Sequence, residues 1–481
     1  MYNLQVPRAY QQSPVCNSQQ RWPVGMTISR GLIVQAPLIS RRQLHVVSRS
    51  RTNVKPASPT PLKFKDYNIP SHDLLMPDFC IPLILLYPNP QLSNPSASKT
   101  AIINLLKKTL SETLSEYYPF AGRLSSSGSH VDCNDEGIHF LEAQIACSLS
   151  EILEKNPVRD EKEGYGHLFP PGSIWHNVSY SRNLMAVQLN HFSCGGIAIA
   201  VILSHRVADG LTLMSFVSYW ARLSRNLNDQ EKLVHRSPCF VHELLLPQSG
   251  NHNLTATQFV APEKNWITTE IVFPHSKVDK LKAELEMQDE QQGIIINKNY
   301  TRNELVTALL YRCAVTAATA SNSGTYTKSV LLQAVNMRPV IDPPLPKTSV
   351  GNLITCNHIP TDTMNETKLN TLVGQMRKGM MQLRGSKSMV GKEAFALIDK
   401  YTKLIYKVYA ISSICKFPLY DETDFGWGRP VKAAVVDTPL VNFIFMMDTP
   451  SRDGIIATVS LEKQDMENFL ANKELLACAS F

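Results

Sequence analysis

The sequence lacks any apolar run long enough to cross a membrane, and it is poor in charged residues. A membrane-spanning helix needs about 20 mostly apolar residues, whereas the apolar stretch Cys80–Tyr87 is short and contains Pro82. Of the 481 residues, 43% are hydrophobic and 19% are charged, a composition that excludes a disordered, collagen-like or coiled-coil chain. We therefore expect a globular protein with no membrane partner, built as one large domain or two to three ordinary ones.

Cysteine is present but lacks the spacing of a metal site or a disulfide framework. The ten cysteines are scattered, none forms Cys-x-x-Cys, and no set of Cys and His has zinc-finger spacing. We expect reduced, mostly buried thiols in a reducing compartment, and no bound metal.

Four motifs of common enzyme classes are also missing. The sequence has no Gly-x-Ser-x-Gly elbow, no His-Glu-x-x-His, no dinucleotide-binding Gly-x-Gly-x-x-Gly and no Walker A loop. These absences remove most support for a serine hydrolase, a metalloprotease, a redox enzyme or an ATP-dependent enzyme.

Acidic residues are absent from positions 1–65, which carry ten of the 48 Lys and Arg residues. The other 38 basic side chains face all 41 acidic ones, so residues 66–481 have a net charge of −3. A body of this charge lacks the basic face that binds a phosphate backbone, and we expect no nucleic-acid partner. Residues 1–45 read as a disordered extension, an organelle transit peptide or a stretch upstream of the true start.

Hydrophobic periodicity predicts a mixture of helices and strands after this segment. Apolar residues recur with helical spacing through residues 98–118, whereas residues 184–192 alternate as a strand does. Residues 225–265 are polar and contain three prolines, which indicates a linker between two halves. The second half reads as further helices and strands, ending in a closing helix over residues 462–476. The pattern predicts an α/β or mixed α+β fold.

A reactive histidine is predicted at position 205. The continuous apolar run 197–203 reads as a buried strand, and Ser204-His205-Arg206-Val207-Ala208-Asp209-Gly210 follows it directly. This order presents one imidazole at the end of a buried strand, where it can accept a proton near neutral pH. Asp209 can turn back to orient the ring or can brace the loop. The non-catalytic alternative is a helix-capping Asp beside an incidental His.

A second unusual cluster is Asp424-Phe425-Gly426-Trp427-Gly428-Arg429-Pro430. Gly426 and Gly428 allow a tight backbone path around Trp427, whose indole N–H can only donate. From these residues alone, a packed turn around a core Trp is favoured over a reactive site.

Together, the two clusters make the sequence resemble the plant BAHD acyl-CoA-dependent acyltransferases, and among them the vinorine synthase-like subgroup. The resemblance covers about residues 46–481 and leaves residues 1–45 outside it. The other matching stretches are Lys55–Pro61, Tyr118–Leu124, Val131–Gly137, Gln333–Arg338 and Val350–Asn352.

The resemblance implies two α/β domains, each like chloramphenicol acetyltransferase, with a channel between them. We expect an N-terminal domain over residues 46–235, a crossover linker over residues 236–265 and a C-terminal domain over residues 266–481. Segments near residues 425–450 are expected to pack with the N-terminal domain. Acyl-CoA would enter the channel from one face and the acceptor from the other.

The resemblance also implies two catalytic residues, His205 and Asp424. His205 would take the proton from an acceptor hydroxyl, whose oxygen would attack the thioester directly without an acyl-enzyme. Asp424 would be required for activity, shaping its turn rather than transferring protons. Asp209 would point away from the substrate and pair with Arg338, which makes both a structural support of the site.

Trp427, together with Gly426 and Gly428, is implied as a candidate oxyanion donor or part of the CoA channel. The implied activity is transfer of an acyl group, expected to be acetyl, to a hydroxyl of an alkaloid, terpenoid or related plant metabolite. N-acylation, hydrolysis by the same His, and a non-catalytic binding paralogue are the alternatives.

The expected partners are acyl-CoA as a co-substrate and a small-molecule acceptor, with no permanently bound cofactor. We expect a monomer in the cytoplasm, or in a plastid or mitochondrion if the N-terminal segment is a transit peptide.

Overall fold

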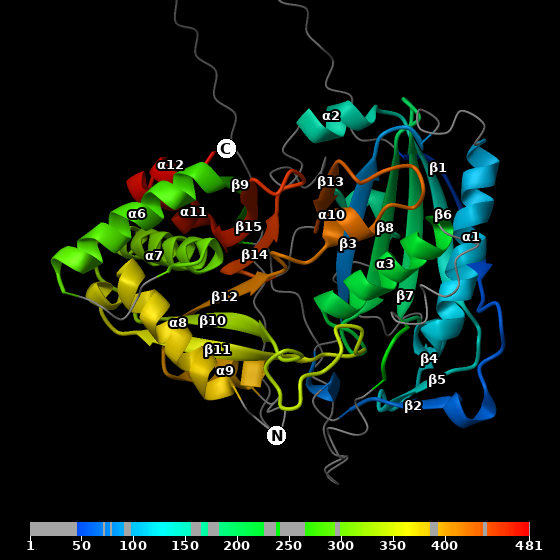
Figure 1. Ribbon diagram of the computed structural model, residues 1–481, viewed down its shortest axis with the longest axis horizontal. Coiled ribbons are helices and arrows are strands. Elements are labelled where there is room, and N and C mark those ends of the chain that lie inside the picture. Colours follow the sequence, from blue (N-terminus) through cyan, green and yellow to red (C-terminus); the bar gives the residue numbers. More distant parts are fainter. Residues whose placement is uncertain are drawn as a thin grey trace, which may run out of the picture. The chain divides into compact units, whose positions relative to one another are not determined.

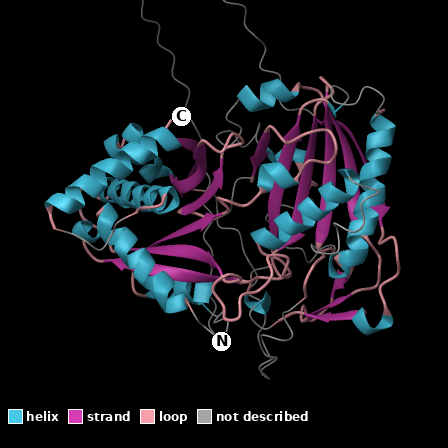
Figure 2. Cartoon of the chain, in the orientation of Figure 1, coloured by secondary structure: helices cyan, strands magenta, loops and turns pink. Residues whose placement is uncertain are grey.

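The structure is a computed structural model, and it describes residues 46–70, 73–76, 79–90, 98–154, 165–171, 182–225, 237–240, 265–293, 299–384, 393–435 and 440–480. The predicted extension at residues 1–45 and nearly all of the predicted linker lie outside these residues. The described chain contains two six-stranded sheets and one three-stranded sheet (Figure 1). Helices accompany both large sheets (Figure 2).

The N-terminal sheet has the strand order β1-β6-β7-β8-β3-β13. Its β6 and β7 pair in parallel, and its other neighbours pair antiparallel. The strands are β1 (Val46–Val54), β3 (Cys80–Tyr87), β6 (Ile138–Ile145), β7 (Met185–Phe192), β8 (Ile197–Ser204) and β13 (Lys432–Ala434). All eight residues of β7 and all eight of β8 are buried, because these strands lie in the middle of the sheet.

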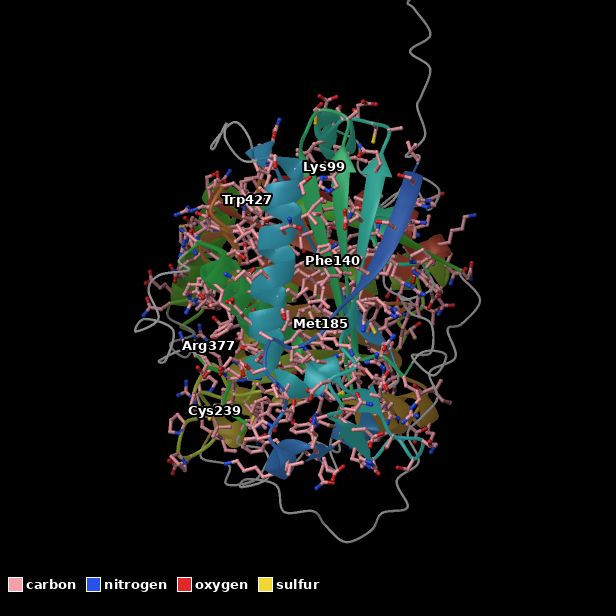
Figure 3. All side chains as sticks on the ribbon, turned by 90° about the vertical axis from the view of Figure 1, so that its right-hand side faces the viewer. Lys99, Phe140, Met185, Cys239, Arg377 and Trp427 are labelled. Atoms are coloured by element: carbon pink, nitrogen blue, oxygen red, sulfur yellow. The ribbon has the colours of Figure 1, made fainter. Side chains whose placement is uncertain are left out.

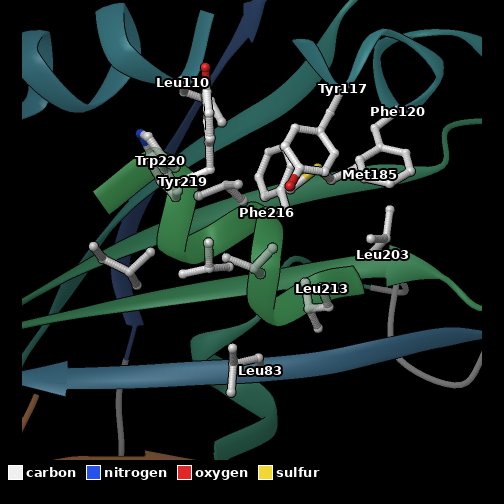
Figure 4. Close-up of a cluster of buried hydrophobic side chains, with 14 of the residues drawn as sticks. Leu83, Leu110, Tyr117, Phe120, Met185, Leu203, Leu213, Phe216, Tyr219 and Trp220 are labelled. Carbon is white, nitrogen blue, oxygen red and sulfur yellow. The ribbon is translucent and has the colours of Figure 1, made fainter. Parts of the chain in front are cut away.

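The central core of this half forms where α1 (Lys99–Glu116) and α3 (Gly210–Arg225) pack together over the sheet. Ser98 caps α1 by accepting from the Ala101 N–H at 3.1 Å, and the helix gives way to the 3-10 turn Tyr118–Ala121 that contains Pro119. Figure 4 shows Phe216 and Trp220 of α3 above Leu83 and Leu203 of the sheet. Figure 3 shows α1 in front of the strands, with Lys99 near one end.

The C-terminal sheet has the order β11-β10-β12-β14-β15-β9. Its strands are β9 (Trp266–Pro274), β10 (Ser329–Asn336), β11 (Ile354–Thr361), β12 (Lys407–Ser413), β14 (Phe443–Asp448) and β15 (Gly454–Glu462). Its helices are α6 (His275–Gln291), α7 (Arg302–Ser321), α8 (Leu369–Leu383), α9 (Glu393–Lys403), α11 (Lys463–Leu470) and α12 (Lys473–Cys478). A capping box of Thr301 and Glu304 begins α7, which is mostly buried.

Several short elements complete the described chain. They are α2 (Leu149–Glu154), α10 (Leu419–Glu422), the 3-10 turns Leu62–Phe64, Asp73–Leu75, Tyr165–Leu168 and Met364–Thr367, and the three-stranded sheet of β2 (Asp66–Asn68), β4 (Arg123–Leu124) and β5 (His130–Asp132). No described helix is both long and apolar enough to span a bilayer.

One strand joins the two halves. β13 comes from late in the sequence yet pairs antiparallel with β3 of the N-terminal sheet, with Ala433 opposite Leu85. The following β14 returns to the C-terminal sheet. The core that contains Trp220 of α3 is therefore built from both halves, since it also includes Phe425 and Met447.

The closing helix predicted over residues 462–476 is two helices, so that prediction is wrong in detail. α11 ends at Leu470, and Asn472 then caps α12 by accepting from the N–H groups of Glu474 and Leu475. The periodic pattern spans the break because both helices bury apolar residues against the same core.

Candidate functional site

A cavity of about 280 Å³ is lined by residues of both large sheets. Its walls come from β3, the start of α3, β10, β12 and β14. Most of the lining side chains are apolar, among them Phe79, Leu213 and Ile411, whereas His205 and Asn336 add polar groups. An apolar cavity with a few converging polar groups is the usual form of a small-molecule site.

His205 lies in the wall of this cavity, where β8 ends. Its backbone N–H donates to the main-chain oxygen of Phe79 at 2.9 Å, which fixes the backbone against the neighbouring segment. The Phe79 ring meets the imidazole edge-on, with 5.3 Å between the ring centroids. The side chain is partly exposed, so the ring is accessible while its backbone is fixed.

The side chain of Asn352, in the loop before β11, lies within hydrogen-bonding distance of the imidazole. The His205 Nδ1 atom lies 2.8 Å from Asn352 Oδ1, and Asn352 Nδ2 donates to the main-chain oxygen of His205 at 2.6 Å. Of the two roles that the sequence left open for Asp209, orienting the ring therefore belongs to Asn352 in this structure.

Asp209 and Arg338, which were expected to pair, form a buried two-point ion pair. Arg338 Nη1 donates to Asp209 Oδ2 at 2.7 Å, and Nη2 donates to Oδ1 at 3.1 Å. Asp209 also accepts from the Thr212 N–H at 2.8 Å, which caps α3, and from the Leu353 N–H at 3.1 Å. One carboxylate thus joins the His205 loop, the first turn of α3 and the segment that carries Asn352.

The electrostatics of this pair favour the charged carboxylate. Burial is the largest single effect and raises the pKa of Asp209, but the charge and hydrogen bonds of Arg338 and the bonds from Thr212 lower it. The resulting pKa lies below the ordinary aspartate value. Asp209 is therefore an ionised brace for the loop.

Asp424 shapes a glycine-containing turn. Its Oδ1 atom accepts from the N–H groups of Gly426 and Gly428, at 2.8 and 2.9 Å, and its Oδ2 atom lies 3.7 Å from Arg225 Nη1. Gly426 and Gly428 have φ angles of 108° and 106°, a region that residues with a Cβ rarely adopt. The carboxylate and the two glycines together fix this path, and none of them is among the residues that line the cavity.

Trp427 packs in the core of the N-terminal half. Its ring stacks on Phe425 with 5.6 Å between centroids, and Tyr87 meets it edge-on at 6.1 Å. Trp427 is not among the lining residues of the cavity described above.

One group of described residues has a geometry that could hold a metal ion. Asp66, His130 and Asp132 bring their ligand atoms within 4.8 Å of one another on the three-stranded sheet. None of the three lines the cavity, and exposed acidic groups of this kind are common without a metal.

Sequence reasoning missed the role of Asn352. The residue stood only within the matching stretch Val350–Asn352, and its partner His205 is 147 positions away. A Gly-Asn pair after a proline-rich loop indicates a turn. Nothing in that local signal points to a contact with a distant histidine.

Comparison with known proteins extends over nearly the whole chain. Residues 44–476 match the profile of a family described as the Transferase family. The 17,18-epoxy-17-hydroxycur-19-ene N-malonyltransferase of Strychnos nux-vomica is 36% identical over 476 residues, 97% of this chain and 96% of that protein. Deacetylvindoline O-acetyltransferase of Catharanthus roseus is 33% identical over 453 residues, 90% of this chain and 97% of that protein.

Solved structures confirm the predicted fold. The crystal structure of vinorine synthase has a TM-score of 0.72 and 29% identity, covering 91% of this chain and 99% of that one. TRI101 of F. sporotrichioides, complexed with coenzyme A and T-2, has a TM-score of 0.66 at 16% identity, covering 86% of this chain and 99% of that one. The expectation of a mixed α/β fold with two acyltransferase domains and a channel between them is correct.

Proposed function

We propose a function for this chain on the premise that it belongs to the Transferase family, the BAHD acyltransferases, whose profile matches residues 44–476. The chain is an acyl-transferring enzyme, and its relatives are named as acyltransferases of specialised metabolites. The proposal concerns which group it transfers, to what, and by which residues.

The proposed reaction is transfer of an acetyl group from acetyl-CoA to a hydroxyl of an alkaloid, terpenoid or related plant metabolite. Coenzyme A as the acyl carrier is supported by its presence in TRI101. Acetyl as the acyl group and oxygen as the acceptor are supported by the name of the Catharanthus roseus relative. The mostly apolar cavity suits an acceptor with a large hydrocarbon skeleton.

The single observation that carries the proposal is the position of His205. Its ring belongs to the wall of a cavity lined from both large sheets, and its Nδ1 atom is engaged by Asn352. Nε2 is then the nitrogen left for an acceptor hydroxyl. A positioned base of this kind contributes about 10²–10⁴-fold to a rate.

In the proposed mechanism, His205 Nε2 takes the hydroxyl proton while the oxygen forms a bond to the thioester carbonyl carbon. The tetrahedral intermediate collapses by breaking the carbon–sulfur bond, and the imidazolium returns the proton to the CoA thiolate. The products are the ester and CoA, and the enzyme is unchanged. Asp209 and Arg338 brace the loop and do not exchange protons.

Release of the free CoA thiol tests the proposed acyl transfer. The protein is incubated with acetyl-CoA and a panel of alkaloid and terpenoid alcohols while thiol release is followed, and ester is identified by mass spectrometry. Release that depends on the alcohol supports the proposal, and release without any acceptor indicates a hydrolase. Absence of release with acetyl-, malonyl- and longer acyl-CoA overturns it.

N-acylation is the second candidate, because the Strychnos nux-vomica relative is named as an N-malonyltransferase. Secondary amines of the same skeletons, offered with acetyl-CoA and malonyl-CoA, distinguish the two candidates. Amide formation faster than ester formation would favour N-acylation.

We further propose a cytoplasmic monomer. Size-exclusion chromatography with light scattering measures the oligomeric state, and mass spectrometry of the mature N-terminus in plant cells tests for removal of a transit peptide.

A further inference from the structure

The side-chain amide of Asn352 holds His205 through two hydrogen bonds, one at its oxygen and one at its NH2 group. Its Oδ1 atom lies 2.8 Å from His205 Nδ1, and its Nδ2 atom donates to the His205 main-chain oxygen at 2.6 Å. A main-chain oxygen can only accept, so the edge of the amide that faces it is the NH2 group. The amide oxygen is thereby turned toward Nδ1, because reversal of the amide would set Oδ1 against the His205 main-chain oxygen, and two acceptors cannot form a hydrogen bond.

This orientation decides where the neutral imidazole carries its proton. An amide oxygen only accepts, so Nδ1 has to be the N–H nitrogen of the ring. Nε2 then carries the lone pair. In the other tautomer, two lone pairs would face each other across the 2.8 Å contact between Asn352 and His205.

The backbone on both sides of Asn352 is held by the buried ion pair. The main-chain oxygen of Gly351 accepts from Arg338 Nη2 at 3.3 Å, and the Leu353 N–H donates to Asp209 Oδ2 at 3.1 Å. Gly351 has a φ of 122°, so the turn that presents Asn352 needs a glycine. The ion pair therefore reaches the imidazole through Asn352 and its backbone.

We propose that Asn352 is a positioning residue that fixes His205 in the Nδ1–H tautomer and so keeps Nε2 as the proton acceptor. The kinetic consequences rest on the proposed acyl transfer, whereas the tautomer can be measured without turnover. The charged side chains that line the same cavity, Asp209 and Arg338, are bound to each other. The neutral amide is thus the group that selects the state of the ring.

Nitrogen NMR of the full-length protein labelled with ¹⁵N-histidine tests the tautomer directly. The His205 signals are assigned by their loss in His205→Gln. At a pH where the ring is neutral, they should report a protonated Nδ1 and an unprotonated Nε2, and in Asn352→Ala they should move toward the average of both tautomers. A dominant Nε2–H form in the unaltered protein overturns the proposal.

Kinetics test the consequence for turnover. Asn352→Ala should lower kcat by about 10–100-fold, the scale of a small misplacement of a reacting group, with a smaller change in the KM for acyl-CoA. Asn352→Asp keeps an acceptor at Nδ1 and adds a negative charge that favours the imidazolium. The acid limb of its kcat/KM profile should therefore move to higher pH by about one unit or more. An acid limb at the same pH in Asn352→Asp and in the unaltered protein contradicts the proposal. Where turnover is too slow to measure, NMR titration of His205 in the two proteins makes the same comparison.

Asn357→Ala is the matched control. Asn357 is a buried asparagine of β11 that donates to the Met376 main-chain oxygen at 3.0 Å, and it is not a cavity-lining residue. Its replacement should lower the melting temperature but leave the histidine spectrum and the pH profile unchanged. Equal effects of the two alanine variants on the spectrum and the profile would indicate a general structural loss and overturn the proposal.

The two proposals fail separately. A protein that transfers no acyl group but shows the Nδ1–H spectrum overturns the proposed function and supports this assignment. A protein that transfers acyl groups with the Nε2–H spectrum overturns this assignment and supports the proposed function.

Discussion

Asp209 and Arg338 lie 129 positions apart in the chain, yet they form a two-point ion pair with side chains only 2% and 1% exposed. The pair joins the loop after β8 to the segment after β10. It therefore connects elements of the two large sheets beside the cavity, with His205 on one of the connected loops.

Removing one partner of this pair should destabilise the fold strongly. We expect Asp209→Ala to lower the free energy of unfolding by about 3–5 kcal/mol, because it leaves the Arg338 charge buried without its partner. Urea unfolding followed by circular dichroism measures the change. The double variant Asp209→Ala with Arg338→Met should regain part of the loss, since no charge is left buried. A single variant as stable as the unaltered protein would refute the bracing role.

The same pair should make stability depend on pH at the acid end. The pKa of Asp209 is lower in the folded protein than its ordinary value. A carboxyl of this kind stabilises the fold above its unfolded pKa, about 3.9, and the stabilisation is lost as the pH falls through the lower folded value. The free energy of unfolding of the unaltered protein should therefore exceed that of the Asp209→Ala, Arg338→Met double variant by a constant amount from about pH 7 to 5, and this difference should shrink below about pH 4. Urea titrations at several pH values measure it, and an advantage that stays constant down to about pH 2 would contradict this assignment.

His205→Ala should separate catalysis from folding. The ring is partly exposed and the backbone bond to Phe79 remains, so the melting temperature should change little. The rate of acyl transfer should fall by about 10²–10⁴-fold, while calorimetry should still detect binding of CoA. Retained turnover in this variant would show that His205 is not the base.

The general fold and the position of His205 could be predicted from the sequence because their signals are local. A buried apolar run followed directly by Ser204-His205 places the residue at a strand end, and β8 indeed ends at Ser204. The helical spacing through residues 98–118 likewise predicts α1, which the structure places at Lys99–Glu116. These features depend on residues that are close together in the chain, so the sequence alone is enough to predict them.

The parts that could not be derived from local signals depend on contacts between distant segments. Arg338 was reached only through the family resemblance, and the role of Asn352 was not predicted, since each meets its partner more than a hundred positions away. The packing of Trp427 against Tyr87 follows from the return of β13 to the N-terminal sheet, a topology that periodicity does not encode.

The last prediction concerns Asp424 and distinguishes a turn-shaping role from proton transfer. One oxygen, Oδ1, accepts both glycine N–H groups, at 2.8 and 2.9 Å. Asparagine can keep an oxygen in that place, whereas alanine cannot. We therefore expect Asp424→Asn to retain most of the activity and stability. Asp424→Ala should lose about 0.5–1.5 kcal/mol of stability for each of the two hydrogen bonds, because the exposed glycine N–H groups then bond to water instead.

Gly428→Ala is the control for this turn, because its φ of 106° is strained for any residue with a Cβ. It should lower the melting temperature as Asp424→Ala does, without changing the carboxylate. Differential scanning fluorimetry and acyl-transfer rates on the same preparations compare the variants. The contradicting result would be an Asp424→Asn variant that keeps its melting temperature but is as inactive as His205→Ala. The carboxylate would then take part in the chemistry, beyond its bonds to the two glycines and its contact with Arg225 at 3.7 Å.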